Sequence, residues 1–135
     1  MTTSDPTLLQ TALCSQLGAA AEMLESAIQA CPEPLWSDWG RNPEFWYTAF
    51  HTLFWLDLYL SPGQDDFAPP APFTLDELDP AGVLQKRVYT QSELLFYLEH
   101  GRRKARRVIS SLDDDRASQR RRFGKNEFSG LEVLL

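Results

Sequence analysis

One segment, residues 42–60, constrains the fold of this chain more than any other. It opens with Asn42 and Pro43, a helix cap followed by a proline in the first turn, and it ends before Pro62. Apolar side chains cover most of its circumference: Trp46, Phe50, Leu53 and Leu60 on one side, and Tyr47, Phe54 and Leu58 on the next. A helix of this kind has to be covered by neighbours on several sides, so we expect it at the centre of an all-α fold.

Two further segments have the periodicity of amphipathic helices. Residues 6–30 follow a predicted cap at Asp5, and residues 90–112 begin with a capping box made of Thr90 and Glu93. The first apolar stripe comprises Leu9, Leu13, Leu17, Ala20, Leu24 and Ile28, and the other comprises Leu94, Leu98, Ala105, Val108, Ile109 and Leu112. Both stripes recur at three- and four-residue steps, which predicts one buried face on each helix.

The remaining segments suggest how the helices are connected and how the chain ends. Residues 64–88 are rich in proline, glycine and aspartate, which predicts an ordered crossover between two parallel helices. Ser129 and Glu132 have the spacing of another capping box, and the sequence reaches Leu135 within about one turn of it. We therefore expect a single domain, residues 1–135, forming a four-helix bundle whose fourth helix is truncated.

Composition narrows the class of protein. With 135 residues, 43% of them hydrophobic, the chain can form one packed core, which excludes an intrinsically disordered protein. It has no run of the roughly 18 apolar residues that a membrane span needs, and no basic-then-apolar secretory signal at its N-terminus. We expect a soluble, cytoplasmic protein that does not enter a membrane. Cys14 and Cys31 are then expected to be free, buried thiols.

Charge is distributed unevenly along the chain. Residues 1–101 carry three basic and fourteen acidic side chains, whereas residues 102–135 carry ten basic and five acidic ones. The basic residues cluster at 102–107 and at 120–122, a pattern that can indicate nucleic-acid binding. The pI near 4.8 and the lack of a helix-turn-helix or zinc-finger pattern favour a solvated helix face and a charged loop instead.

Two histidines are the candidates for chemistry. His51 falls on the Tyr47 side of the apolar helix and is expected to face the interior, where a core role and a ligand role both stay open. His100 is expected on the solvent side of its helix. Asp57 follows His51 by six residues, which is not one helical face, so its carboxylate is expected to anchor a neighbouring backbone or side chain. Two histidines cannot form a three-histidine metal site within one chain.

Three segments of the sequence resemble the DinB/YfiT-like superfamily. They are residues 45–57 (FWYTAFHTLFWLD), 92–100 (SELLFYLEH) and 128–135 (FSGLEVLL), and His51 is the most specific mark. The resemblance implies an up-down-down-up four-helix bundle with a long crossover between helices two and three. It also implies a divalent metal, nickel or zinc, held by a histidine matching His51 and by a His-x-x-x-His pair that has no counterpart before Leu135.

The resemblance implies a metal-dependent enzyme of the thiol-cofactor transferase or hydrolase type, and the residues alone leave its substrate open. With one of three ligands present, this chain alone is not expected to bind metal tightly. The alternative is a non-catalytic interaction module, in which the apolar groove left by the missing helix binds a second copy or a partner helix. On that account we expect a homodimer, and nucleic acid is the least favoured partner.

Overall fold

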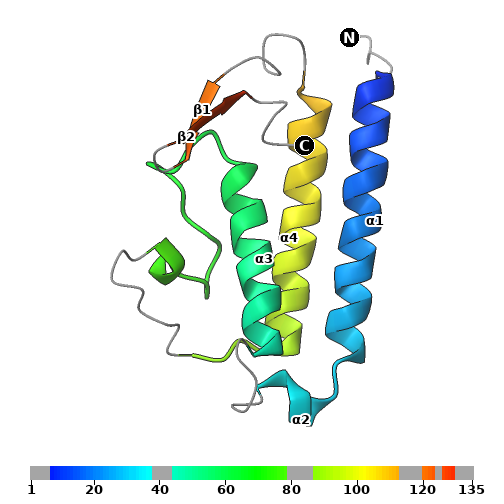
Figure 1. Ribbon diagram of the computed structural model, residues 1–135, viewed down its shortest axis with the longest axis vertical. Helices are drawn as coiled ribbons and strands as arrows, with labels where there is room; N and C mark the ends of the chain where they lie inside the picture. The colour runs from blue at the N-terminus through cyan, green and yellow to red at the C-terminus, as the bar shows by residue number, and fades with distance from the viewer. Residues whose placement is uncertain (1–6, 38–43, 79–86, 113–119, 124–125, 130–135) are drawn as a thin grey trace.

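The computed structural model describes residues 7–37, 44–78, 87–112, 120–123 and 126–129. Its elements are the α-helices α1 (Leu8–Ala30), α2 (Glu33–Trp36), α3 (Phe45–Tyr59) and α4 (Gln91–Ser110), the 3-10 helix η1 (Asp76–Leu78), and the strands β1 (Arg120–Phe123) and β2 (Asn126–Ser129). The three long helices lie side by side and form most of the fold, in agreement with the all-α prediction (Figure 1). The short helix α2 and the hairpin of β1 and β2 lie at opposite ends of this layer (Figure 1).

Helix α4, rather than α3, occupies the centre. It packs extensively against both α1 and α3, whereas α1 and α3 touch only sparsely (Figure 1). The prediction that the most apolar helix is central was therefore wrong. Helix α3 is covered on one side by α4 and on another by the described parts of the crossover, residues 60–78 and 87–90, whose aromatic side chains pack against it in place of a further helix.

Helices α1 and α4 run in opposite directions. Near one end, the Gln10 side-chain amide donates to the Leu112 carbonyl at 2.9 Å, and near the other end Gln91 donates to the Ile28 carbonyl at 2.8 Å. Both contacts join the ends of one helix to the backbone of the other, so they satisfy carbonyl groups that lack a partner within the helix.

Helices α3 and α4 run in the same direction, and the crossover returns the chain between them (Figure 1). Trp46 and Tyr89, which stand at the starts of the two helices, have ring centroids 6.0 Å apart, and Asp57 and Lys104 meet near their ends. Parallel neighbours need a long connection, as predicted for this segment. The expected fourth helix falls on residues 130–135, which lie outside the described residues, so the up-down-down-up order stays a prediction.

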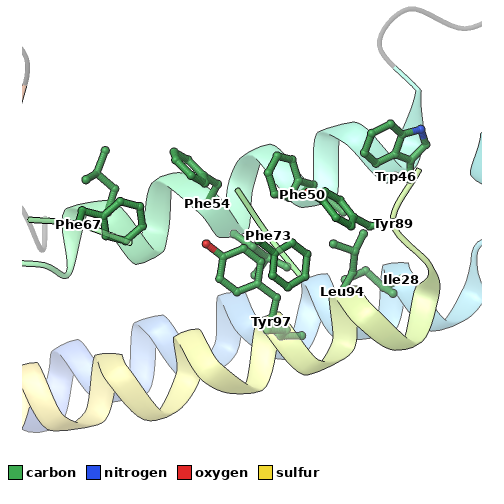
Figure 2. Packing of buried hydrophobic residues seen from close by; sticks show 13 residues of the cluster. Ile28, Trp46, Phe50, Phe54, Phe67, Phe73, Tyr89, Leu94 and Tyr97 are labelled. Atoms are coloured by element: carbon green, nitrogen blue, oxygen red, sulfur yellow. The ribbon is translucent and has the colours of Figure 1, made fainter. Parts of the chain in front are cut away.

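An aromatic core joins α3, α4 and the crossover (Figure 2). Phe73 of the crossover lies between the two helices, with its ring centroid 5.9 Å from that of Phe50 and 4.2 Å from that of Tyr97, stacked on both. The fully buried members of this core include Phe50, Phe54, Leu53, Leu58, Leu94, Leu98, Tyr89, Tyr97 and Ile28. Burying an aromatic side chain removes a large apolar area from water, so this cluster dominates the cohesion of the fold.

The helix starts agree only in part with the predicted caps. Thr90 and Glu93 form the predicted capping box of α4, with both reciprocal hydrogen bonds present. The cap of α1 is Thr7, which forms a capping box with Gln10, so the prediction of Asp5 was wrong. A glutamine three residues after a threonine completes the same reciprocal pair as a glutamate does, and this explains the later start.

The basic residues at 120–122 lie in β1 and not in the predicted charged loop. Strand β1 pairs with β2 in antiparallel register, with Arg121 opposite Phe128 and Phe123 opposite Asn126. Only two residues, one of them Gly124, separate the strands in the sequence, a spacing typical of a tight hairpin. Ser129, the predicted cap of a fourth helix, is the last residue of β2.

Across the parts of the chain that the structure describes, no helix combines the length and the apolar character needed to cross a lipid bilayer.

Candidate functional site

His51 lies on α3 and faces the crossover rather than the helical core. Its side chain is 51% exposed, and its ring lies beside those of Tyr47 and Trp55, at centroid distances of 5.9 and 6.1 Å. The prediction that it faces the interior was wrong. Each residue turns a helix by about 100°, and the fully buried Phe50 and Phe54 fix the inward direction, which leaves His51 at the edge of that face.

The nearly buried carboxylate of Glu77 holds the imidazole of His51. Glu77 belongs to η1, its side chain is 6% exposed, and its Oε1 accepts a hydrogen bond from His51 Nδ1. The Tyr47 hydroxyl donates to the same carboxylate at 3.0 and 3.2 Å, and the Trp55 indole nitrogen donates at 3.4 Å. A carboxylate withdrawn from water needs such donors, and three residues of one helix supply them.

The same contacts perturb the ionisation of Tyr47. Burial, followed by its hydrogen bond to Glu77, raises the pKa of Tyr47 from 10.0 to about 12. Its hydroxyl therefore remains a donor to the carboxylate throughout the neutral range, and it does not compete with His51 for the role of base.

The remaining ring nitrogen of His51 is available for chemistry. Within the described part of the chain, Nε2 has no hydrogen-bond partner, while Nδ1 is occupied by Glu77. A carboxylate on one ring nitrogen fixes the tautomer that presents a lone pair on the other, which is the usual arrangement around a metal-bound or base histidine. The described residues contain no group of three His, Cys, Asp or Glu side chains able to hold a metal ion.

A second polar cluster lies between α3 and α4, around the buried carboxylate of Asp57. Lys104 Nζ lies 2.5 Å from Asp57 Oδ1, the Tyr97 hydroxyl donates to Oδ2 at 2.9 Å, and His100 Nε2 lies 3.3 Å from Oδ1. Lys104 also donates to the Ser61 hydroxyl at 2.6 Å. Burial and then the neighbouring charge of Asp57 raise the pKa of Tyr97 far above its usual value. The anchoring role predicted for Asp57 is confirmed.

His100 and Lys104 are not the solvent-side residues that the sequence suggested. The side chain of His100 is only 30% exposed and that of Lys104 only 18%, because both point toward Asp57. Arg102 is also engaged, since it contacts Glu25 of α1 at 2.6 Å. The solvated helix face is confirmed for the exposed side chains of Arg103, Arg106 and Arg107.

A largely apolar groove runs between α1, α3 and α4. Its volume is about 520 Å³, and it is lined mainly by Leu17, Gly18, Ala20, Ala21 and Leu24 of α1, Thr52 and Leu56 of α3, and Leu98, Gly101, Ala105 and Ile109 of α4. The predicted stripe of α1 is therefore only partly covered, and Ala20 within it is exposed. Cys14, at the edge of the groove, is exposed and Cys31 is half-buried, so neither is buried as predicted, and neither forms a disulfide.

Comparison with known proteins finds no family model, no curated protein and no solved structure that matches this chain. The resemblance to the DinB/YfiT-like superfamily accordingly stays a prediction, and the features of the molecule that bear on function are the geometry around His51 and the groove. Glu77 was not among the predicted site residues. It lies 26 residues from His51 in a segment without periodicity, where nothing in the sequence pairs the two.

Proposed function

We propose that this protein contributes to a metal-dependent enzyme in which His51 is one ligand of a divalent metal such as nickel or zinc. The supporting observation is the half-exposed imidazole whose Nδ1 is bound by the nearly buried Glu77 and whose Nε2 has no hydrogen-bond partner among the described residues. The resemblance of the sequence to the DinB/YfiT-like superfamily points to the same residue. Thiol-cofactor transfer or hydrolysis is the reaction class that this resemblance implies.

The donor chemistry around His51 fits one corner of an open metal site. Imidazole nitrogen suits nickel and zinc, and the carboxylate on the opposite nitrogen raises the basicity of the ligand. A site of this kind needs about three protein ligands, and the described residues provide one. The other ligands would have to come from outside the described residues or from another chain, so we expect weak binding by this chain alone.

Paramagnetic Ni²⁺ tests the proposal without requiring a complete site. In NMR spectra of the full chain, we expect the ring protons of His51 to broaden at metal concentrations that leave those of His100 sharp. His100 is the matched control because its side chain is partly buried and its Nε2 faces Asp57. The broadened signals should be absent from the spectrum of His51→Ala, which confirms their assignment to His51. In His100→Ala the His51 ring protons should still broaden. Equal broadening of both rings, or broadening of His100 first, would contradict the proposal.

The groove favours a second candidate function, self-association. We propose α1 of a second copy as its occupant. Helix α1 exposes Leu8, Leu9 and Met23 and carries acidic but no basic side chains, whereas Arg106 at the groove has no ion pair among the described residues. The surfaces are thus complementary in both hydrophobicity and charge, and a two-fold dimer would use each of them twice.

The oligomeric state decides this second candidate. Multi-angle light scattering should give the mass of a dimer for the full chain and of a monomer for Ala20→Arg, which places a charge on an exposed, groove-lining position. Phe96→Arg is the control, because Phe96 is 56% exposed on α4 but does not line the groove. A monomeric wild-type protein, or a dimer that survives Ala20→Arg, excludes the groove as a dimer interface.

A further inference from the structure

We infer that Glu77 is a positioning residue that fixes His51 as the Nδ1–H tautomer and so presents Nε2 to solvent as the reactive nitrogen. The role of Nε2 as a metal ligand rests on the proposed function, but the tautomer of His51 does not. The tautomer itself follows from the contact between Nδ1 and the Glu77 carboxylate, and it can be measured with no metal present.

Glu77 is nearly buried and His51 is half-exposed, as expected when the first side chain positions the second. The Glu77 side chain is 6% exposed and that of His51 is 51% exposed, so the carboxylate is fixed within the protein and the imidazole projects outward from it. An ionised carboxylate can only accept hydrogen bonds, and the ring nitrogen that faces it must therefore carry the proton. In the neutral imidazole, a proton on Nδ1 leaves the lone pair on Nε2.

The surroundings of Glu77 hold it in place independently of His51. Tyr47 and Trp55, one turn before and one turn after His51 on α3, both donate to the carboxylate. The Leu78 amide donates to the Leu75 carbonyl at 2.9 Å within the turn that carries Glu77. With two donors from α3 besides His51, the carboxylate has little freedom to turn away and release the ring.

His100 shows the opposite arrangement in the same molecule. Its Nε2, rather than its Nδ1, faces a carboxylate, that of Asp57, at 3.3 Å. The same rule therefore predicts the Nε2–H tautomer for His100 and the Nδ1–H tautomer for His51. The two rings differ in which nitrogen is open, and each serves as the internal reference for the other.

Nitrogen NMR of the ring atoms in the metal-free full chain tests this inference, since protonated and unprotonated ring nitrogens have well-separated shifts. In the wild type we expect the Nδ1–H pattern for His51 and the Nε2–H pattern for His100. Glu77→Met, which keeps the volume of the side chain without its acceptor, and Glu77→Ala should each remove the Nδ1–H preference of His51. In both variants an unchanged His100 pattern reports that the helices remain packed.

The control is Glu99→Ala, which removes another carboxylate of the domain, 43% exposed on α4, and should change neither ring. An Nε2–H pattern for His51 in the wild type would overturn the inference, and so would an unchanged pattern in a folded Glu77 variant. The metal titration remains a separate measurement. If the tautomer shifts as expected but Ni²⁺ does not reach His51, the proposed function fails while the positioning role of Glu77 stands.

Discussion

Replacing Lys104 by methionine should destabilise the protein far more than its place in a basic run suggests. The ammonium group of Lys104 lies 2.5 Å from Asp57 Oδ1 and 2.9 Å from the Asp57 carbonyl, and the Asp57 side chain is only 1% exposed. Methionine keeps most of the aliphatic stem but removes the charge. Among the described residues, the buried carboxylate would then retain the contacts with Tyr97 and His100.

The size of the effect follows from the burial of the pair. Removing one partner of a buried ion pair typically costs about 3–5 kcal/mol, and since Lys104 keeps 18% exposure we expect a loss of about 3 kcal/mol. For a chain of this length each kcal/mol lowers Tm by roughly 3–4 °C, so the expected shift is about 10 °C. Urea unfolding followed by circular dichroism measures the free energy of unfolding directly.

A matched control distinguishes this pair from a surface contact. Arg103 is one position earlier in the same run, 73% exposed and paired with Glu99, so Arg103→Met should cost about 0.5 kcal/mol or less. Asp57→Asn combined with Lys104→Met should be less destabilising than the two single changes added together, by about 2 kcal/mol. If Lys104→Met costs no more than Arg103→Met, the buried pair does not hold α3 and α4 together.

Three further predictions test the core, a helix cap and the response to pH. Phe50→Ala removes a fully buried ring that contacts Phe73, and it should lower the free energy of unfolding by about 3–5 kcal/mol in urea titrations. Thr90→Ala removes the cap of α4 and should cost about 1 kcal/mol by the same measurement, whereas no change would mean that the capping box contributes nothing. Burial raises the pKa of Tyr47 to about 12, so its contribution is complete below pH 10 and is lost as pH rises from 10 to 12; alkaline unfolding should begin later in this window for Tyr47→Phe.

The helices could be predicted because their signals are local. The apolar steps of α1 and α4, the capping box at Thr90 and the breakers around Pro62 all act over a few residues. The position of α4 at the centre could not be predicted, because it depends on how the crossover covers α3. Periodicity shows that a helix has an apolar surface, but it does not show which segment covers that surface.

The candidate sites were predictable only where a charged residue interrupted an otherwise apolar helix. Asp57 within an apolar helix signals a buried partner, and Tyr97, His100 and Lys104 recur at the steps of a single helix face, which could have identified those partners. The sequence did not reveal the role of Lys104, because this residue belongs to a run of basic residues expected to be exposed. Glu77 gave no such indication, since its partner is distant along the chain and its own segment has no period.

The insertion of Phe73 between two parallel helices determines how the molecule opens. If α3 moved away from α4, the faces of Phe50 and Tyr97 would lose a stacked neighbour, and if the crossover detached, it would leave a hole at the same place. Separating α3 from α4 and detaching the crossover therefore break many of the same contacts, and each costs most of the free energy that the other costs. The connection thus belongs to the same cooperative unit as the helices, and the amide proton of Phe73, which donates to the Pro70 carbonyl, should exchange with deuterium as slowly as those in the middle of α4.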